Sequence, residues 1–299
     1  MSTTLPDSYE QFLTDTTALS QLRPNTLRAY RYELSAAALN KRFRVPLDDL
    51  TLAMLEQWIS RKPASPSTIG RRAAALSRFF DWAIRHDLCE RNPLVGRASV
   101  RSRRRLPRPV RNPDDLDAVE TAIAGAPQPF RLIFTILRET GMRVSEVLDL
   151  RLGDVSLEAS HEALRVREPK NGIERTVVLG PTATPKTLRG LRAYLKIFQG
   201  HGAHELLFRS NRGTRISYDA AHYQWARLCI KAGLIDEKGK PRYSIHQLRH
   251  TRGSELIAQG QRVEIVQRVL GHRDIRSTLG YAELNEAQVR EALEQPGKR

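Results

Sequence analysis

The chain has 299 residues, 40% of them hydrophobic, which predicts a soluble protein of two ordinary domains whose apolar runs are too short to span a membrane. Its 49 Lys and Arg against 33 Asp and Glu give a formal net charge of +16, which favours a nucleic-acid partner over a membrane because no amphipathic anchor or lipidation motif is visible. Only two cysteines, Cys89 and Cys229, and an N-terminus without an export signal exclude a disulfide framework and predict a cytoplasmic protein.

Residues 1–98 are predicted to form a compact helical domain. Start and stop signals delimit four helices, at Tyr9–Leu19, Pro24–Ala38, Leu52–Ile59 and from Ser65 to near Pro93. Residues 99–112 are predicted to be an arginine-rich linker that is extended when free and able to lie along a DNA backbone. A plain solvated linker would not need so many arginines.

The fourth predicted helix has two faces of different chemistry. Apolar residues recur at helical spacing on the core side, at Leu76, Phe79, Phe80 and Ala83. Arginines recur on another side, at Arg71, Arg78 and Arg85. An arginine-lined face fits phosphate contacts, and an ordinary solvated charged face fits the same pattern equally well.

Residues 113–299 are predicted to form a second domain, which opens at the helix-start signal Asn112-Pro113-Asp114. Two helices follow, Leu116–Ala124 and Pro129–Glu139, and the second is apolar nearly all round and hence central. Gly141 ends this helix, and Arg143 opens the next one beside free backbone donors, an arrangement that can cradle a phosphate.

A β-hairpin is predicted next, with strands Glu162–Arg167 and Ile173–Leu179 around a turn that has Lys170 at its tip. A lysine at a hairpin tip is normally idle, but in a DNA groove it could donate a proton to a leaving oxygen. Helices are then expected at Lys186–Gln199 and Ser217–Ala232.

The stretch from Tyr243 to Leu284 carries most of the candidate chemistry. His246, Arg249 and His250 fall on neighbouring parts of one helix face, a second helix ends at Gly271, and His272 and Tyr281 follow. Guanidinium groups hold phosphate oxygens, imidazoles move protons, and a phenol can attack phosphorus. The i, i+4 spacing of His246 and His250 also allows a zinc site, but the sequence HQLRH places an arginine beside the ion, so no metal is expected.

These motifs resemble those of the tyrosine recombinase (phage integrase, Xer-type) family over nearly the whole chain. The similar segments are ETGMRVSEVLDLRLGDV around Arg143, PKNG at Lys170, HQLRHT at His246, LGH at His272, and Tyr281. The resemblance implies a mainly α fold with a small β-sheet, in which an N-terminal helical, SAM-like core-binding domain precedes a mixed α/β catalytic domain. It also implies a bacterial, nucleoid-associated site-specific DNA recombinase that cleaves and rejoins strands through a 3′-phosphotyrosine without metal, ATP or another cofactor.

The resemblance further implies a role for each matching residue. Tyr281 would be the nucleophile, Arg143 and Arg249 would clamp the phosphate, and Lys170 would protonate the leaving 5′ oxygen. His246 would assist proton transfer at the tyrosine, and His272 would hydrogen-bond the phosphate. Of the neighbouring residues, His250 is expected to be structural and Glu146 to brace Arg143. Expected DNA contacts are Arg28, Arg31, Thr68, Arg71, Arg72, Arg103, Arg104 and Arg105.

The family's assembly predicts the partners, namely double-stranded DNA with specific core sites and a homotetramer on two synapsed sites, with a monomer in free solution. The helix-like tail Asn285–Leu293 is expected to be donated to a neighbouring protomer, an ordinary terminal helix being the alternative. A partner recombinase or accessory DNA-binding protein stays open, as does the choice between integration, excision and dimer resolution. Topoisomerase-like cleavage without recombination and a catalytically inert DNA-binding regulator are the alternative functions.

Overall fold

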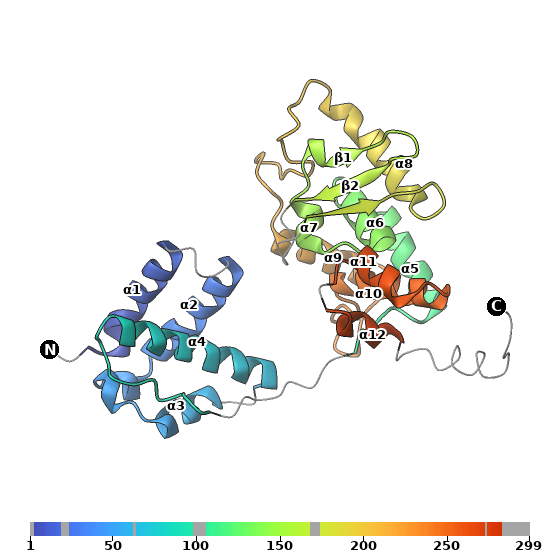
Figure 1. Cartoon of the computed structure of the whole chain (residues 1–299). Coiled ribbons are helices and arrows are strands. Elements are labelled where there is room, and N and C mark those ends of the chain that lie inside the picture. Colours follow the sequence, from blue (N-terminus) through green and yellow to red (C-terminus); the bar gives the residue numbers. More distant parts are fainter. Residues whose placement is uncertain are drawn as a thin grey trace. The chain divides into compact units, whose positions relative to one another are not determined.

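The computed structural model describes residues 3–18, 24–61, 64–97, 106–167, 174–272 and 274–282. The chain divides into two compact units, Met1–Arg105 and Leu106–Arg299, and each has a hydrophobic core of its own (Figure 1). The structure is mainly helical with one small antiparallel sheet, so the predicted fold class is confirmed. No helix within the described ranges is long and apolar enough to cross a membrane.

The first unit consists of helices packed around an aromatic core. Its elements are α1 (Leu5–Ala18), α2 (Pro24–Ala38), α3 (Leu52–Ile59) and α4 (Pro66–Arg85), with short 3-10 turns η1 (Lys41–Phe43) and η2 (Leu47–Asp49). The Ser65 side chain caps α4 by accepting the backbone N–H of Thr68, and Pro66 occupies the first turn. The predicted core face of α4 is confirmed by four fully buried residues, Leu76, Phe79, Phe80 and Ala83.

The C-terminal end of α4 was predicted wrongly, because the helix ends at Arg85 rather than near Pro93. Asp87 takes a left-handed conformation with φ of 54°, which breaks the helical path and which aspartate tolerates better than most residues. The chain then folds back onto α4, where the Asn92 side-chain amide donates to Asp81 at 2.7 Å. The signal read as a helix end is therefore the end of a docked loop.

The second unit contains a three-stranded antiparallel sheet and eight described α-helices. The sheet has the order β1-β2-β3, with Leu164 opposite Val177, and the prediction missed its short edge strand β1. The elements in chain order are α5 (Pro113–Ala124), α6 (Phe130–Thr140), α7 (Val144–Leu148), η3 (Leu152–Asp154), β1 (Val155–Ser156), β2 (Ala163–Val166), β3 (Arg175–Val178), α8 (Pro185–Tyr194), η4 (Leu195–Phe198), α9 (Tyr218–Lys231), α10 (Ile245–Ala258), α11 (Val263–Leu270) and α12 (Arg276–Ala282).

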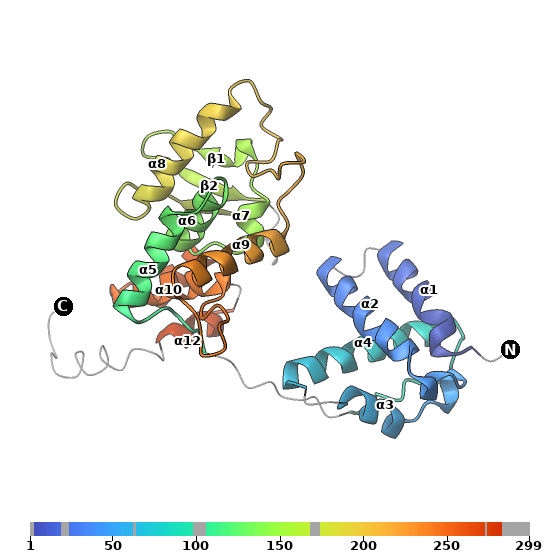
Figure 2. The same ribbon diagram turned by 180° about the vertical axis from the view of Figure 1, so that it is seen from behind.

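Helix α6 is the centre of the second unit, as its apolar sequence predicts. Its core residues are at most 2% exposed, and it packs against both α8 and α10. Figure 2 shows α6 and α8 in front of the sheet, so both helices cover the same face of it. Burial of so much apolar surface on one helix makes α6 a rigid support for the elements that flank it.

Helices α10, α11 and α12 pack together and form a small core of their own, drawn in orange and red in Figure 1. Leu256, Ile257, Val266 and Leu270 bury the ring of Tyr281. Gly271 ends α11, as predicted, and its φ of +65° is the left-handed conformation common at helix C-termini. This packing brings Leu270 at the end of α11 and Tyr281 near the end of α12 against Gly253 in the middle of α10.

Candidate active site

Five of the six residues predicted to be catalytic lie together in the second unit. Arg143 precedes α7, His246 and Arg249 are on α10, His272 follows α11, and Tyr281 is on α12. Lys170 is in the segment 168–173, outside the described residues. The Arg249 guanidinium interacts electrostatically with both Arg143 and Tyr281, so residues far apart in sequence share one local environment.

Arg249 is a buried cation whose hydrogen-bonding capacity is not used up. Arg249 is only 3% exposed, and its Nη1 donates to the carbonyl oxygen of Gly141 at 2.6 Å. Its Nη2 is also buried and has no acceptor among the described residues. Burial and the charge of Arg143 lower the pKa of Arg249 to about 10, which still leaves it positive near neutral pH. A buried, unpaired N–H donor is costly unless an anion completes it.

Arg143 is held in place by two contacts. Its Nη1 donates to Oε1 of Glu146 at 2.8 Å, and its Nη2 donates to the carbonyl oxygen of Gly271 at 3.0 Å. Burial favours the neutral form of Glu146, but Arg175 and Arg143 outweigh it, so the pKa of Glu146 lies below its usual value. The predicted bracing of Arg143 by Glu146 is confirmed.

Tyr281 is 2% exposed, and its hydroxyl lies 2.9 Å from Nδ1 of His250. The tyrosine ring stacks on His272 with 6.2 Å between ring centroids, and His246 meets His250 edge-on at 4.7 Å. Burial raises the pKa of Tyr281, and Arg249 and Arg143 offset this only in part. His250, which is expected from the sequence to be structural, therefore contacts the hydroxyl directly.

His272 is held by a side chain of α12. Its Nδ1 lies 2.9 Å from the hydroxyl of Thr278, a residue with no exposed surface. Burial, with Arg249 and Arg143 nearby, lowers the pKa of His272 to about 3. Burial, with His246 and Arg249, likewise lowers the pKa of His250 to about 4. Both imidazoles are consequently neutral near pH 7.

These histidines predict a loss of stability in mild acid. Above pH 6.5 each is neutral in both the folded and the unfolded chain, so neither makes the free energy of unfolding depend on pH. Below pH 6.5 the unfolded chain binds protons first, which costs at most about 1.4 kcal/mol per pH unit for each histidine until the folded pKa is reached. Urea denaturation of the protein and of His250→Gln between pH 7 and 4.5 measures this. The variant should show the shallower decline, and equal slopes would contradict the prediction.

Gly253 on α10 makes room for the tyrosine ring. A Cβ atom added there would lie 2.8 Å from Cε1 and 2.9 Å from Cζ of Tyr281, closer than carbon atoms normally approach. The backbone of α10 thus forms the wall against which Tyr281 rests. Only a glycine allows this approach while Tyr281 keeps its contact with His250.

Among the predicted DNA contacts, the structure describes five residues in the first unit. Arg28 is exposed, Arg31 pairs with Glu10 at 3.0 Å, and Thr68 lies 3.0 Å from the Ser65 hydroxyl. Arg71 pairs with the buried Glu33 at 2.9 Å. Arg72 is largely buried, and its Nη1 donates to the carbonyl oxygens of Ile59 and Arg61. Arg103, Arg104 and Arg105 lie outside the described residues.

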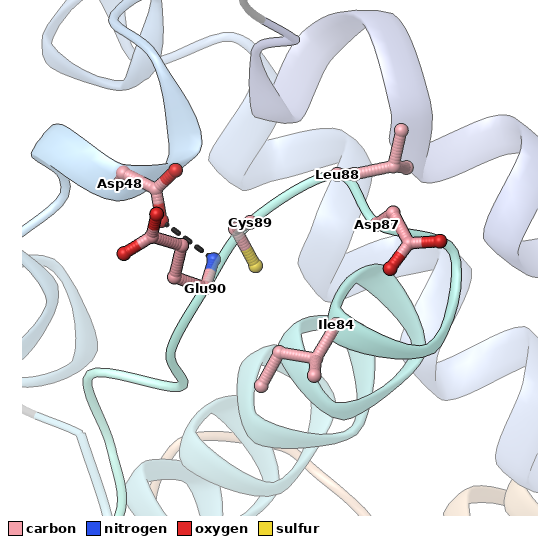
Figure 3. A pocket seen from close by; sticks show the side chains of 6 residues that line it. All are labelled: Asp48, Ile84, Asp87, Leu88, Cys89 and Glu90. Carbon is pink, nitrogen blue, oxygen red and sulfur yellow. Dashed lines mark hydrogen bonds between the residues drawn. The ribbon is translucent and has the colours of Figure 1, made fainter.

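A pocket in the first unit is lined by acidic side chains and offers no anion site. Asp48, Asp87 and Glu90 line it together with Cys89, and the backbone N–H of Glu90 donates to Asp48 at 2.8 Å (Figure 3). Three carboxylates repel a phosphate. Within the described part of the chain, no three His, Cys, Asp or Glu side chains are grouped so that they could hold a metal ion.

Arg175 is the functional candidate that the sequence analysis missed. It opens β3 on the same face as the buried Val177, and its Nη2 donates to Oε2 of Glu146 at 2.7 Å. The alternation of residues along a strand could have found it. Arg175 is two positions from Val177 and so faces inward, and an inward arginine needs a buried anionic partner.

Comparisons with known proteins give a consistent result over both units. Residues 113–288 match the model of the phage integrase family, and residues 7–87 match that of the phage integrase N-terminal SAM-like domain. The chain is 31% identical over 307 residues to tyrosine recombinase XerC of Mycobacterium sp. (strain KMS), covering 97% of each protein. It is 31% identical over 257 residues to tyrosine recombinase XerC of Mycobacterium bovis (strain BCG / Pasteur 1173P2), covering 82% of each.

Solved structures share the fold at lower sequence identity. The Tn1549 transposon integrase in complex with a circular intermediate DNA has a TM-score of 0.71 and 20% identity, over 97% of this chain and 99% of that chain. A lambda integrase tetramer bound to a Holliday junction has a TM-score of 0.67 and 22% identity, over 90% of this chain and 76% of that chain.

Proposed function

The chain belongs to the phage integrase family, the tyrosine-type site-specific DNA recombinases, and we propose that Tyr281 is its nucleophile within a metal-independent phosphate site. The observation that carries this assignment is the buried Arg249, whose Nη2 has no acceptor among the described residues. Arg143 adds a second guanidinium, and the tyrosine hydroxyl is within the range of both charges. A phosphodiester supplies the oxygens that this site lacks.

The two arginines provide the charge that the reaction needs. In the pentavalent transition state, negative charge grows on the non-bridging oxygens, and fixed guanidinium donors stabilise that charge without reorganising. Arg143 is already oriented by Glu146 and Gly271, and Arg249 by Gly141. Neutral His272 joins them as a donor from Nε2 when the Thr278 hydroxyl donates to Nδ1.

Proton transfer accompanies strand cleavage at both oxygens. As the Tyr281 oxygen bonds to phosphorus, its proton passes to Nδ1 of neutral His250, which lies 2.9 Å away. His246 assists on the same side through its contact with His250. The bond from phosphorus to the 5′ oxygen breaks, and that oxygen takes a proton from Lys170. The resulting 3′-phosphotyrosine keeps one ester bond for each one broken, so the freed 5′-hydroxyl can reverse the step.

The arginines of α2 and α4 contact the backbone of double-stranded DNA at a specific core site, with affinity that falls as salt rises. The protein is a monomer in free solution, and four copies assemble on two synapsed sites. The tail Asn285–Leu293, which lies outside the described residues, is exchanged between neighbouring protomers of this tetramer. A neighbour of the same fold, lambda integrase, is a tetramer on a Holliday junction. The protein works at the bacterial nucleoid in the cytoplasm.

The first experiment is to recover the bound site by DNA protection and sequencing, and then to incubate the protein with a nicked duplex of that site in a chelator without ATP. A covalent protein–DNA adduct is expected, and its absence would refute the proposal. Exchange of strands between two labelled copies of the site separates recombination from the alternative, relaxation of a supercoiled plasmid without exchange. An inert DNA-binding regulator would bind the site and do neither.

Gly253→Ala is expected to reduce adduct formation by about 10- to 100-fold, because the new methyl group displaces the Tyr281 ring from its position. The control is Gly190→Ala in α8, where an added Cβ would lie 2.7 Å from a Leu132 methyl group, away from the site. Both variants overpack a helix contact, and only the first should lose cleavage rate at saturating DNA. Equal cleavage rates in the two variants would show that Gly253 does not position Tyr281 for cleavage.

A further inference from the structure

Arg175 shares the carboxylate of Glu146 with Arg143 and also binds the end of α11, just before the Gly271 carbonyl that Arg143 contacts. Its Nη2 donates to Glu146 at 2.7 Å, and its Nη1 donates to the carbonyl oxygen of Val269 at 3.2 Å, at the end of α11. Arg143 in turn donates to Glu146 and to Gly271, two residues beyond Val269. The two arginines therefore share a carboxylate on one side and the end of α11 on the other.

Gly271 both ends α11 and leaves room for the Arg175 side chain. A Cβ atom added at Gly271 would overlap Nε of Arg175 and lie 2.8 Å from its Cζ. The guanidinium thus lies directly against the backbone of the turn that carries His272. Arg175 is largely buried, and burial lowers its pKa while Glu146 raises it in partial compensation. A buried cation retained at such cost needs a reason beyond packing.

We infer that Arg175 is a positioning residue for strand cleavage, which holds Glu146 and the Gly271 turn so that Arg143 and His272 address the same phosphate. Arg175 is also the first residue of β3, five positions after Lys170 in the sequence, so it fixes the base of the hairpin relative to the two arginines. It makes no contact with DNA in this role. The inference rests on the proposed function of the site.

The test measures the single-turnover cleavage rate at saturating nicked duplex, together with the dissociation constant for that duplex. Arg175→Met is expected to lower the rate by about 10- to 100-fold and to leave the dissociation constant within about twofold. Arg175→Lys keeps the charge but lacks the forked guanidinium that reaches Glu146 and Val269 together. Its rate should therefore lie between those of the unmodified protein and Arg175→Met. If Arg175→Met does not fold, the cleavage rate of Arg175→Lys alone tests the inference. The matched control is Arg165→Met on β2, an arginine half exposed to solvent, which should cleave normally.

The coupling to Glu146 distinguishes positioning from a general structural role. In a Glu146→Gln background, Arg175→Met should lower the rate by clearly less than it does in the unmodified protein, because one of the two contacts through which Arg175 acts is already weakened. Rates that multiply independently, an unchanged rate in Arg175→Met, or a loss of DNA affinity that accounts for the whole defect would overturn the inference. If the unmodified protein forms no adduct, the proposed function itself fails, so the two failures are distinguishable.

Discussion

Replacing Tyr281 with phenylalanine is expected to abolish the covalent protein–DNA adduct, because the change removes the only atom of that side chain able to bond phosphorus. The ring keeps its place in the small core with Leu256, Ile257, Val266 and Leu270. The substitution removes the hydrogen bond between the hydroxyl and His250, so the free energy of unfolding should change by no more than about 1.5 kcal/mol. Gel separation of adduct from free DNA measures the first quantity, and urea denaturation the second.

The matched control for this variant is Tyr243→Phe. That tyrosine also donates its hydroxyl to a partner in the second unit, Asp115 at 2.6 Å, but it is not part of the site. Its variant should form adduct at the rate of the unmodified protein. Adduct formation by Tyr281→Phe would show that the phenol of Tyr281 is not the nucleophile, and loss in both variants would show that the loss is not specific to Tyr281.

Arg249→Met is expected to separate stability from activity. Cleavage should fall by at least about 10²- to 10³-fold, because a preorganised donor to the transition state is removed. Stability should not fall, because the substitution removes a buried guanidinium whose Nη2 has no acceptor among the described residues and which lies near the charge of Arg143. The thioether chain of methionine fills most of the same volume.

The control for Arg249→Met is Arg252→Met, three positions further along α10, where the side chain pairs with Glu255 instead. This variant should cleave DNA within a few-fold of the unmodified rate. A strongly destabilised Arg249→Met would show that the buried cation is needed for the fold. A cleavage rate close to normal would show that the two-arginine account of the site is wrong.

Features set by local chemistry could be predicted from the sequence. The end of α11 at Gly271 and the position of Arg143 at the start of α7 both follow from helix-terminus rules, and the structure confirms them. The central place of α6 follows from its apolar surface in the same way. Such signals depend on a few neighbouring residues, so they need no knowledge of distant contacts.

Features set by tertiary contacts could not be predicted. His246 and His250 are four residues apart, so spacing alone puts both near one face of α10, and the docking of α12 decides that His250 meets Tyr281. Arg175 gains its meaning from Glu146, 29 residues earlier in the chain. The end of α4 depends on the loop that Asn92 ties back onto the helix. Each case requires the relative placement of elements that sequence periodicity leaves open.

The most direct test of the central claim is to locate the protein–DNA bond chemically. The adduct formed on nicked core-site DNA would be digested with protease and nuclease, and the modified peptide sequenced by mass spectrometry. We predict one modified residue, Tyr281, joined through its oxygen to the 3′-phosphate of the nucleotide at the cleavage point, with a 5′-hydroxyl on the released strand. A bond to any other residue, or a link through a 5′-phosphate, would contradict the account.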